Sequence, residues 1–504
     1  MDYMELLGSI FTLQNMMMAV LGVVAGIIFG AIPGMTATMA VAVFLPLTYA
    51  YDLQTSLILL LGLYVGGISG GLVPAILINI PGTPSSITTC FDGYPMTLRG
   101  EGERALKIGI TSSLLGGMFS LVCLWLFTPP LASLAIKFSA VEKFLVILFA
   151  MTIIAALSKG KMLVGIWMGL LGVLMAMMGT FEDNNKLRLV PDLLRKELIY
   201  GFALLPVLIG LFALGQMLEE AERGMPRDQV DKEMIGKNAR QFSFKDFKGS
   251  AVNVIRSSAL GTFMGILPGV GGSAASLMAY SQTKNFSKNK DLLGKGAEEG
   301  LISSESANNG LTGGALIPLL SMGIPGDSTT AVLVGAFALQ GMSIGPLFIS
   351  QNPDLWYTIL IGLALCNVLM FAVMFFPIKL ISKIVLIPKQ RMYPVIILMC
   401  VVGAYAANYG VMFDVWSLVF FAILGYLFVK LKLPSTPFLI GFILGGDLEH
   451  YFVDALKGSG GDLTVFFTRG PICWVLWLMI IASVAYAVVQ NRNEKKSILK
   501  QAAE

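Results

Sequence analysis

The stretch NIPGTPSS at residues 79–86 has a counterpart, GIPGDSTT, at residues 323–330. In each stretch a Pro-Gly pair is followed at once by small polar residues, and the flanking sequence is strongly apolar. A second matched pattern stands upstream of each, GIIFGAIPG at 26–34 and GTFMGILPG at 261–269. Apolar segments interrupted by Gly and Pro at matching places in two halves of a chain indicate a binding site at the middle of a membrane transporter. The sequence therefore predicts one structural plan that is used twice.

The composition indicates a membrane protein with many spans. Of the 504 residues, 56% are hydrophobic and 13% are charged, whereas soluble proteins average about 25% charged residues. Apolar runs of the length that a spanning helix needs, about 20 residues, recur from end to end. We expect an all-α polytopic membrane protein with two inverted repeats, each holding a helical hairpin and a broken helix, plus scaffold helices in an elevator-like arrangement. The small net charge of +4 comes from basic residues in short loops, so a nucleic acid is not an expected partner.

The apolar runs divide the chain into two repeat halves, a linker and a tail. The hairpin and the broken helix of one half make up one copy of the plan. The expected parts are a first half at 1–218 with a hairpin at 11–50 and a broken helix at 56–97, a cytoplasmic linker at 219–249, a second half at 250–490 with a hairpin at 250–283 and a broken helix at 301–349, and a cytoplasmic tail at 491–504.

Lys and Arg orient these segments, because cytoplasmic loops are enriched in these residues. The loop between hairpin and broken helix has no cation in the first copy, at 51–54, but several in the second, at 284–295. The distribution of these cations along the chain places the N-terminus outside and the C-terminus inside. It also predicts that the repeats are inverted, related by an axis in the membrane plane. The assignment fits least well at 182–197, which is placed outside although it carries four basic residues.

The two Pro-Gly breaks supply the candidate substrate site. A helix broken inside hydrocarbon exposes unpaired N–H and C=O groups, which are tolerated only inside protein or along a wet cavity. The polar residues that follow suit N-cap positions of new half-helices, whose free N–H groups and partial positive charge attract a carboxylate. Two such ends facing each other would hold an anion with several carboxylates; the alternative is two kinks packed with small residues. The candidate substrate-binding residues are Asn79, Gly82, Thr83, Ser85, Ser86, Gly326, Ser328, Thr329 and Thr330 at the breaks, and Thr36 and Ser273 at the hairpin tips, where Thr38, Gly271 and Gly272 are further candidates.

Ion coupling is assigned to a second group of residues. Asp327 has no acidic counterpart in the first copy, where Thr83 stands. An acid within a membrane segment is a functional candidate, either as a ligand of Na⁺ or as a proton carrier, although a helix cap facing water is an equal alternative. The candidate ion-coupling residues are Asp327, Ser321, Glu305 and Asn308. Apart from Na⁺ as a possible coupling ion, no cofactor or metal is expected.

No catalytic set emerges from the sequence, so we do not expect an enzyme. The five cysteines have neither metal-ligand nor redox-motif spacing, and the single histidine, His450, stands at the end of a segment. There is also no phosphate-binding loop. Uphill transport would therefore draw on an ion gradient or on another subunit.

Five motifs together resemble a known family. They are GAIPG at 30–34, NIPGTP at 79–84, DGYP at 92–95, ESANN at 305–309 and GIPG at 323–326. Nearly the whole chain is similar to the large membrane subunit of the bacterial tripartite tricarboxylate transporters, and the motifs are specific in combination.

The resemblance implies a permease of the bacterial cytoplasmic (inner) membrane. It implies two protein partners, a small membrane subunit of about four helices and an extracytoplasmic solute-binding protein. It also implies import of di- and tricarboxylates such as citrate, driven by a Na⁺ or H⁺ gradient. The alternatives are a carboxylate channel, a stand-alone carrier for other small organic acids, and a membrane enzyme or assembly scaffold.

Overall fold

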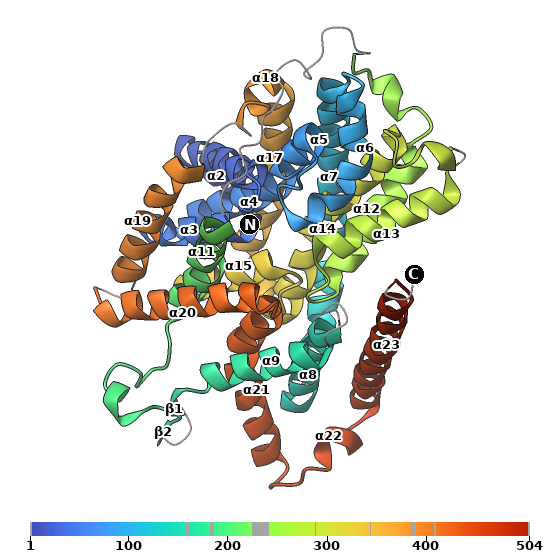
Figure 1. Cartoon of the computed structure of the whole chain (residues 1–504). Coiled ribbons are helices and arrows are strands. Elements are labelled where there is room, and N and C mark those ends of the chain that lie inside the picture. Colours follow the sequence, from blue (N-terminus) through green and yellow to red (C-terminus); the bar gives the residue numbers. More distant parts are fainter. Residues whose placement is uncertain are drawn as a thin grey trace. The chain divides into compact units, whose positions relative to one another are not determined.

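The computed structural model describes residues 3–156, 162–181, 186–223, 241–287, 289–342, 344–384, 389–407 and 410–501 (Figure 1). Within these ranges the only strands are β1 (Gly179–Phe181) and β2 (Lys186–Arg188), which pair antiparallel. Six helical stretches of the described chain are long and apolar enough to cross a membrane: Leu13–Ala31, Leu53–Ile78, Gly102–Ala135, Leu204–Glu222, Pro353–Phe375 and Met412–Lys430. The predicted fold class, an all-α polytopic membrane protein, is confirmed.

The chain forms two compact units, each assembled from two stretches of sequence. Unit one contains Met1–Leu131 and Glu220–Ala407, and unit two contains Ala132–Glu219 and Asn408–Glu504. Both Pro-Gly breaks and both hairpins lie in unit one. The continuous repeat halves predicted above stay a prediction, and residues 224–240 of the predicted linker lie outside the described residues.

In unit one, each copy is a helical hairpin followed by a helix that stops and restarts. The first copy contains α2 (Leu13–Ala31), α3 (Ala37–Phe44), η1 (Leu45–Ala50), α4 (Leu53–Gly70), α5 (Leu72–Ile78), η2 (Pro84–Ser86) and α6 (Ile87–Leu98). The second contains α12 (Ala251–Ile266), α13 (Gly271–Phe286), η7 (Lys290–Leu292), α14 (Glu298–Met322) and α15 (Ser328–Leu339). The other elements of this unit are α1 (Tyr3–Ile10), most of α7 (Gly102–Ala135), η6 (Phe244–Phe247), α16 (Phe348–Gln351), α17 (Pro353–Phe375), α18 (Ile378–Ile381) and α19 (Lys389–Ala407).

Unit two holds the remaining elements. They are α8 (Ala140–Ala156), α9 (Met162–Ala176), the two strands, η3 (Asp192–Leu194), α10 (Leu204–Ile209), η4 (Gly210–Leu214), most of α11 (Gly215–Arg223), α20 (Met412–Lys430), α21 (Ser435–Gly458), α22 (Val465–Thr468) and α23 (Pro471–Gln501). Arg188, the last residue of β2, pairs with Glu449 of α21 through contacts of 2.5 and 2.9 Å, and its guanidinium covers the Phe181 ring. One of the four basic residues of the loop at 182–197 is therefore neutralised by an ion pair within unit two.

The glycines of the hairpin helices explain why the two broken helices are so closely held. A Cβ added to Gly30 of α2 would lie 2.2 Å from the carbonyl oxygen of Gly67 in α4. In the second copy, a Cβ on Gly261 of α12 would lie 2.1 Å from the carbonyl oxygen of Ala307 in α14. Small residues allow such backbone contact between membrane helices. Each hairpin is therefore seated directly on its own broken helix.

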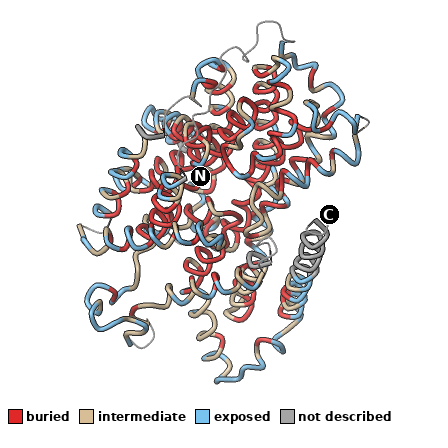
Figure 2. Tube along the Cα trace, viewed as in Figure 1, coloured by how far each residue is buried: buried red, intermediate tan, exposed pale blue. Residues whose placement is uncertain are grey.

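The two broken helices are buried along most of their length, as much of the molecule is in Figure 2. Every residue from 55 to 77 is buried within the protein. Almost every residue of α14 is buried as well, and the Ser69 hydroxyl of α4 donates to the Asn309 side chain of α14 over 2.7 Å. The helices that lead into the two breaks therefore lie inside protein, where interrupted backbone in a membrane protein is tolerated.

Cysteine labelling tests the predicted inversion of the copies. Ala50→Cys, at the exposed end of the first hairpin, and Lys290→Cys, at an exposed position between the second hairpin and its broken helix, are expected to react with a membrane-impermeant maleimide from opposite sides. Ala50→Cys should react in intact cells, and Lys290→Cys only in inside-out vesicles. The background should lack the five native cysteines. Labelling of both positions from one side would refute the inversion.

Candidate functional site

The two breaks have the same local backbone geometry. Helix α5 ends at Asn79 (φ 57°) and α14 ends at Gly323 (φ 78°), both left-handed. The next N–H reaches back in each case, from Ile80 to the Pro74 carbonyl and from Ile324 to the Pro318 carbonyl, over 3.4 and 3.3 Å. A left-handed residue with backward hydrogen bonds is a common helix C-terminus, because it satisfies carbonyl groups that the helix leaves open. Each helix therefore ends immediately before its Ile-Pro-Gly.

The glycine of each Pro-Gly pair packs against the hairpin of its own copy. A Cβ on Gly82 would lie 2.1 Å from the Gly30 carbonyl oxygen, and a Cβ on Gly326 would lie 2.4 Å from the Gly265 carbonyl oxygen. The Gly269 N–H also donates to the Gly326 carbonyl over 2.8 Å. Only glycine fits at either place, and the contact fixes where the following polar residues lie.

The polar residues that follow each Pro-Gly pair contact the hairpin of the opposite copy. In the second break, the Thr329 hydroxyl lies 2.9 Å from the Thr38 hydroxyl of α3, in the first hairpin. In the first break, Ser85 lies against Gly272 of the second hairpin, where an added Cβ would be 2.5 Å from the Ser85 Cβ. The two breaks and the two hairpin tips therefore belong to one connected region of unit one.

At the second break, side chains of the break itself form the hydrogen bonds that cap the new helix. Asp327 is 7% exposed and caps α15, because its Oδ1 accepts from the Thr330 N–H over 2.7 Å. The Thr330 hydroxyl accepts from the Asp327 N–H over 2.9 Å, which completes a reciprocal capping box. The other oxygen, Oδ2, accepts from the Tyr64 hydroxyl of α4 over 2.8 Å. Asp327 is thus a helix cap, as the alternative reading proposed, but it is buried and bound to the first copy rather than facing water.

At the first break, the backbone N–H groups at the start of the new half-helix have no side-chain cap. The Thr83 hydroxyl lies 3.0 Å from both the Ser85 and the Ser86 hydroxyls, and all three side chains are buried. No side chain caps η2 or α6. The two breaks, alike in backbone, therefore differ in how their half-helices begin.

Asn308 of α14 points toward this first break. Its side chain is 1% exposed, and neither amide atom forms a hydrogen bond within the described residues. A Cβ placed on Gly272 would lie 3.0 Å from the Asn308 Oδ1 and 3.3 Å from the Ser85 Oγ. The Asn308 amide oxygen, Ser85 and Gly272 are thus packed closely together.

Glu305 lies one turn before Asn308 and is fully buried. Its carboxylate accepts from the Thr89 hydroxyl of α6 over 2.5 Å and from the Ser113 hydroxyl of α7 over 3.1 Å. The Asn308 amide lies near this carboxylate and interacts with it. Two hydroxyl groups hold the acid, and no basic side chain of the described chain forms an ion pair with it. An acid in such a place needs a cation or a proton to offset the cost of its burial.

Several other candidates lie at the edge of this region. Ser321 donates to the Ile317 carbonyl of its own helix over 2.6 Å. Thr36 caps α3 by accepting from the Met39 N–H over 3.1 Å, so it is Thr38 that reaches the opposite copy. Asn79 is exposed, and Ser273 and Ser328 are partly buried.

Sequence reasoning missed three residues that join the region together, Tyr64, Thr89 and Ser113. Tyr64 could have been identified from the sequence as a candidate, since a buried tyrosine hydroxyl in an apolar helix needs a hydrogen-bond partner. Thr89 and Ser113 could not have been identified in this way, because small hydroxyl residues are common in membrane helices.

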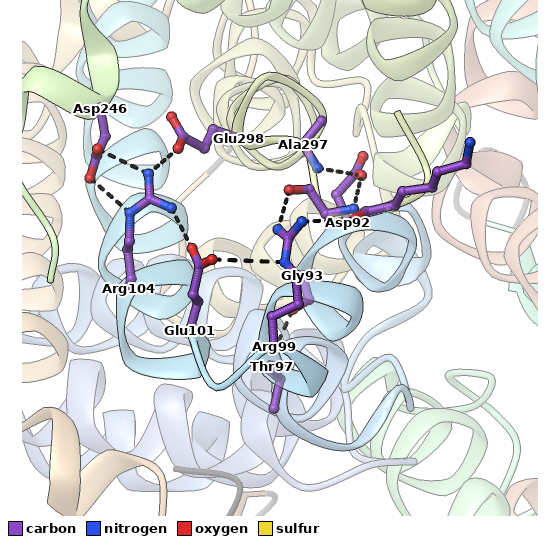
Figure 3. Close-up of polar contacts among 11 residues, drawn as sticks. Asp92, Gly93, Thr97, Arg99, Glu101, Arg104, Asp246, Ala297 and Glu298 are labelled. Carbon is purple, nitrogen blue, oxygen red and sulfur yellow. Dashed lines mark hydrogen bonds and ion pairs between the residues drawn. The ribbon is translucent and has the colours of Figure 1, made fainter. Parts of the chain in front are cut away.

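A second polar cluster ties α6 to the start of α14 (Figure 3). Asp92 is fully buried, and its Oδ1 accepts from the N–H groups of Gly294, Gly296 and Ala297 over 2.8–2.9 Å. Gly294 and Gly296 have φ angles of 85° and 94°, which turn successive N–H groups toward one point and form an anion-binding nest. The Tyr280 hydroxyl donates to the other oxygen over 2.8 Å. Asp92 of the first copy therefore holds the loop that leads into α14 of the second copy.

Two arginines, Arg99 just after α6 and Arg104 in the first turn of α7, extend this polar cluster. Arg99 donates to the carbonyl oxygens of Lys295 and Gly296 over 3.3 and 2.6 Å. Arg104, 4% exposed, pairs with three carboxylates, at 2.5 Å to Glu101, at 3.0 Å to Asp246, and to Glu298. The connection between α6 and α7 is thus joined to the polypeptide on both sides of the second hairpin.

Comparison with known proteins places this architecture in a family. The tripartite tricarboxylate transporter TctA family matches residues 16–440. An uncharacterized 52.8 kDa protein in the TAR-I ttuC' 3' region of Agrobacterium vitis is 34% identical over 484 residues, or 96% of this chain and 95% of that protein. An uncharacterized protein in the TAR-II ttuC' 3' region of the same organism is 35% identical over 238 residues, or 47% of this chain and 98% of that protein. No solved structure matches. A match over this much of the chain shows that the protein belongs to the tripartite tricarboxylate transporter TctA family.

Proposed function

We propose that this chain is the large permease subunit of a secondary transporter that depends on a binding protein and imports citrate-like di- and tricarboxylates. A Na⁺ or H⁺ gradient supplies the driving force. The observation that carries the proposal is the pair of helix breaks, each seated on its own hairpin and each facing the hairpin of the other copy.

The chemistry of the breaks suits this role. Broken helices in a membrane present backbone N–H groups and hydroxyls without an exposed charge, which suits an anion that must bind and then leave. Asp327 and Glu305, two buried acids in the same unit, are the residues that we assign to ion coupling. Ser321 is assigned more weakly to this role, because its hydroxyl is used within its own helix.

Two protein partners follow from membership of a tripartite family. We propose a small membrane subunit of about four helices and an extracytoplasmic solute-binding protein that delivers the substrate. The complex would lie in the bacterial inner membrane, with the N-terminus of this chain outside and its C-terminus inside. An elevator-like movement of the inverted repeats against the scaffold helices would expose the site to each side in turn.

A carboxylate channel is the main alternative, and one observation weighs against it. A channel needs a continuous polar path, whereas the second break is closed by direct contacts between Thr38 and Thr329 and between Tyr64 and Asp327. A stand-alone carrier for other small organic acids differs only in its partners and its substrate.

Counterflow in proteoliposomes tests the proposal. The purified complex, loaded with unlabelled citrate, is expected to accumulate labelled citrate against its gradient only when the binding protein is added. A carrier exchanges substrate one for one, whereas a channel dissipates the gradient. Malate and succinate in parallel would report the class of acid, and replacement of Na⁺ by choline or addition of a protonophore would identify the coupling ion. Absence of counterflow with every acid would refute the proposal.

A further inference from the structure

We infer that Glu305 binds the coupling proton, and that the hydroxyls of Thr89 and Ser113 reverse a hydrogen bond when it does. The inference rests on the proposed function, in which a Na⁺ or H⁺ gradient supplies the driving force, and it commits that function to H⁺. It also separates the two buried acids of unit one, because it changes the role of Asp327 from ion coupling to a structural helix cap.

Glu305 lies where three helices of unit one meet. It belongs to α14 of the second copy, whereas Thr89 lies in the first turn of α6, just after the first break, and Ser113 lies in α7. Each hydroxyl donates to a different carboxylate oxygen, Thr89 to Oε1 over 2.5 Å and Ser113 to Oε2 over 3.1 Å. The acid therefore joins the half-helix after the first break to the broken helix of the second copy.

The packing around Glu305 excludes solvent. Its exposed fraction is 0%, as are those of Thr89 and Ser113. Beside them α7 rests on α14 backbone to backbone, since a Cβ added to Gly116 would lie 2.2 Å from the Ser306 carbonyl oxygen. An ionised carboxylate in such a place is costly without a cationic partner. A bound proton removes that charge.

Charged and titratable side chains on the helices around α14 bond to other groups. They include Cys90 and Asp92 of α6, Tyr280 of α13, Tyr64 of α4, Arg256 of α12, and Arg104 and Lys107 of α7, whose partners are the Ser86 carbonyl, Tyr280, Asp92, Asp327, Asn253 with Thr283, three acids, and Glu103 respectively. Cys90 interacts electrostatically with Glu305, but a thiol carries no positive charge. Among the described residues no cation therefore takes the place of the proton.

The distances at Glu305 fit hydrogen bonds rather than a metal ion. A hard cation holds about six to eight oxygens at about 2.3–2.6 Å, so that neighbouring ligands in an octahedral arrangement stand about 3.3 Å or more apart. The contacts with Thr89 and Ser113 are 2.5 and 3.1 Å, which are O–H···O distances. Asn308 is the third described side chain that interacts with the carboxylate, so the ligand set is also too small for Na⁺.

The two hydroxyls can accommodate a proton without the movement of a helix. When a proton from water binds to one oxygen of Glu305, the new O–H must donate, so the hydroxyl beside it becomes the acceptor and turns its own hydrogen elsewhere. Serine and threonine in helices can donate to a carbonyl of the preceding turn. Thr111 and Ser112 of α7 do so here, to Lys107 and Ile108, each over 2.8 Å. Apart from that one O–H bond, no covalent bond forms or breaks.

This position links the proton to the first break. For Thr89 the carbonyl of the preceding turn is that of Ser85, which belongs to the break itself. Because Glu305 has no exposed surface, a proton enters or leaves only when one of the three helices around it moves. Proton exchange is then tied to movement of the helix that carries the break, as coupled transport requires.

Asp327 has surroundings of a different kind. Its carboxylate accepts from the Thr330 N–H and hydroxyl, each over 2.7 Å, and from the Tyr64 hydroxyl over 2.8 Å. It stands at the N-terminus of α15, where a backbone N–H and the helix dipole favour a negative charge. Glu305 lies inside its helix and has no backbone donor. Of the two acids, Asp327 thus uses its charge to hold the fold together.

The first test detects the proton on Glu305 without any transport. Infrared spectra of the full-length protein in detergent are compared between acidic and alkaline pH, in choline buffer without Na⁺. A protonated carboxyl group has a C=O band that a carboxylate lacks, and Glu305→Gln is expected to lose a band that titrates in the wild type. Ser113→Ala removes a donor to the ionised form, so its band should persist to higher pH.

Ser112→Ala is the matched control. Ser112 is the neighbouring residue and is also 0% exposed, but its hydroxyl donates within its own helix, to the Ile108 carbonyl. This variant and Asp327→Asn should both keep the wild-type band and its titration. A titrating band that disappears in Asp327→Asn and persists in Glu305→Gln would overturn the inference. If Glu305→Gln does not fold, an unchanged titration in Ser113→Ala would overturn it instead.

The second test measures proton movement in proteoliposomes that contain the complex, with the binding protein added. A pH-sensitive dye trapped inside should report acidification as citrate enters, and a pH gradient alone should drive citrate accumulation in the absence of Na⁺. Both responses should be lost in Glu305→Gln, whose neutral side chain cannot carry the proton. Accumulation that requires a Na⁺ gradient and leaves the internal pH unchanged would overturn the inference.

Counterflow distinguishes failure of this inference from failure of the proposed function. If the wild type shows counterflow but neither the Glu305 band nor proton movement, only the assignment of the proton fails. A wild type without counterflow of any acid would refute the proposed function, and the inference with it.

Discussion

Replacing Asp92 with alanine is expected to lower the free energy of unfolding by about 3–5 kcal/mol, the cost of leaving buried polar groups without their charged partner. The change strips an acceptor from three backbone N–H groups and from the Tyr280 hydroxyl. Asp92→Asn retains the shape of the side chain and should cost about 1–2 kcal/mol, since a neutral acceptor holds N–H groups less strongly.

Thermal unfolding in detergent and hydrogen exchange measure this effect together. In Asp92→Ala the amides of Gly294, Gly296 and Ala297 should lose protection even where the rest of α14 keeps it. Asp291→Ala, at an exposed acid of the same connection, is the control and should behave as wild type. Unchanged exchange in Asp92→Ala would show that water replaces the carboxylate without cost.

Gly82→Ala should cost about 3 kcal/mol, the upper part of the range for overpacking, and should abolish citrate counterflow. The added Cβ would lie 2.1 Å from the Gly30 carbonyl oxygen and 2.8 Å from the Gly71 Cα. Both are backbone atoms of helices that cannot shift alone, so the break itself must move. Gly326→Ala, whose Cβ would meet the Gly265 carbonyl oxygen at 2.4 Å, should have the same effect.

Gly446→Ala provides the comparison for these glycines. This residue lies in α21 of unit two, and a Cβ added there meets nothing within 4 Å. Alanine also favours a helix more than glycine does, so its unfolding temperature should equal or exceed that of wild type. Equal stability of Gly82→Ala and Gly446→Ala would contradict the tight packing of the break.

The sequence was most informative where a residue type has a single backbone consequence. The two helices end at Ile78 and Met322, just before Pro81 and Pro325, and the expected broken helix at 56–97 overlaps α4 to α6, at 53–98. The expected hairpin at 250–283 likewise corresponds to α12 and α13, at 251–286. Proline and glycine constrain the chain locally, so these features needed no knowledge of the tertiary structure.

Contacts between the copies were not predictable in the same way. The Tyr64–Asp327 bond joins residues 263 positions apart, and the Thr89–Glu305 bond joins residues 216 apart. Their pairing depends on which helix faces lie together, which composition and spacing do not determine. The loop at 182–197 was difficult to place on one side of the membrane for a related reason. Arg188 in this loop forms an ion pair with Glu449, which is far away in sequence.

The position of Asp92 has a consequence for the order of synthesis. The backbone N–H groups that donate to it are synthesised more than 200 residues later, so a ribosome delivers α6 to the bilayer long before these donors exist. During that interval the nascent chain carries an unmatched negative charge at a position that becomes fully buried, and an insertase or the aqueous surface must accommodate it. Maturation of the N-terminal half therefore waits for translation past Ala297, and a transcript truncated before that codon would yield an immature product for quality-control proteases.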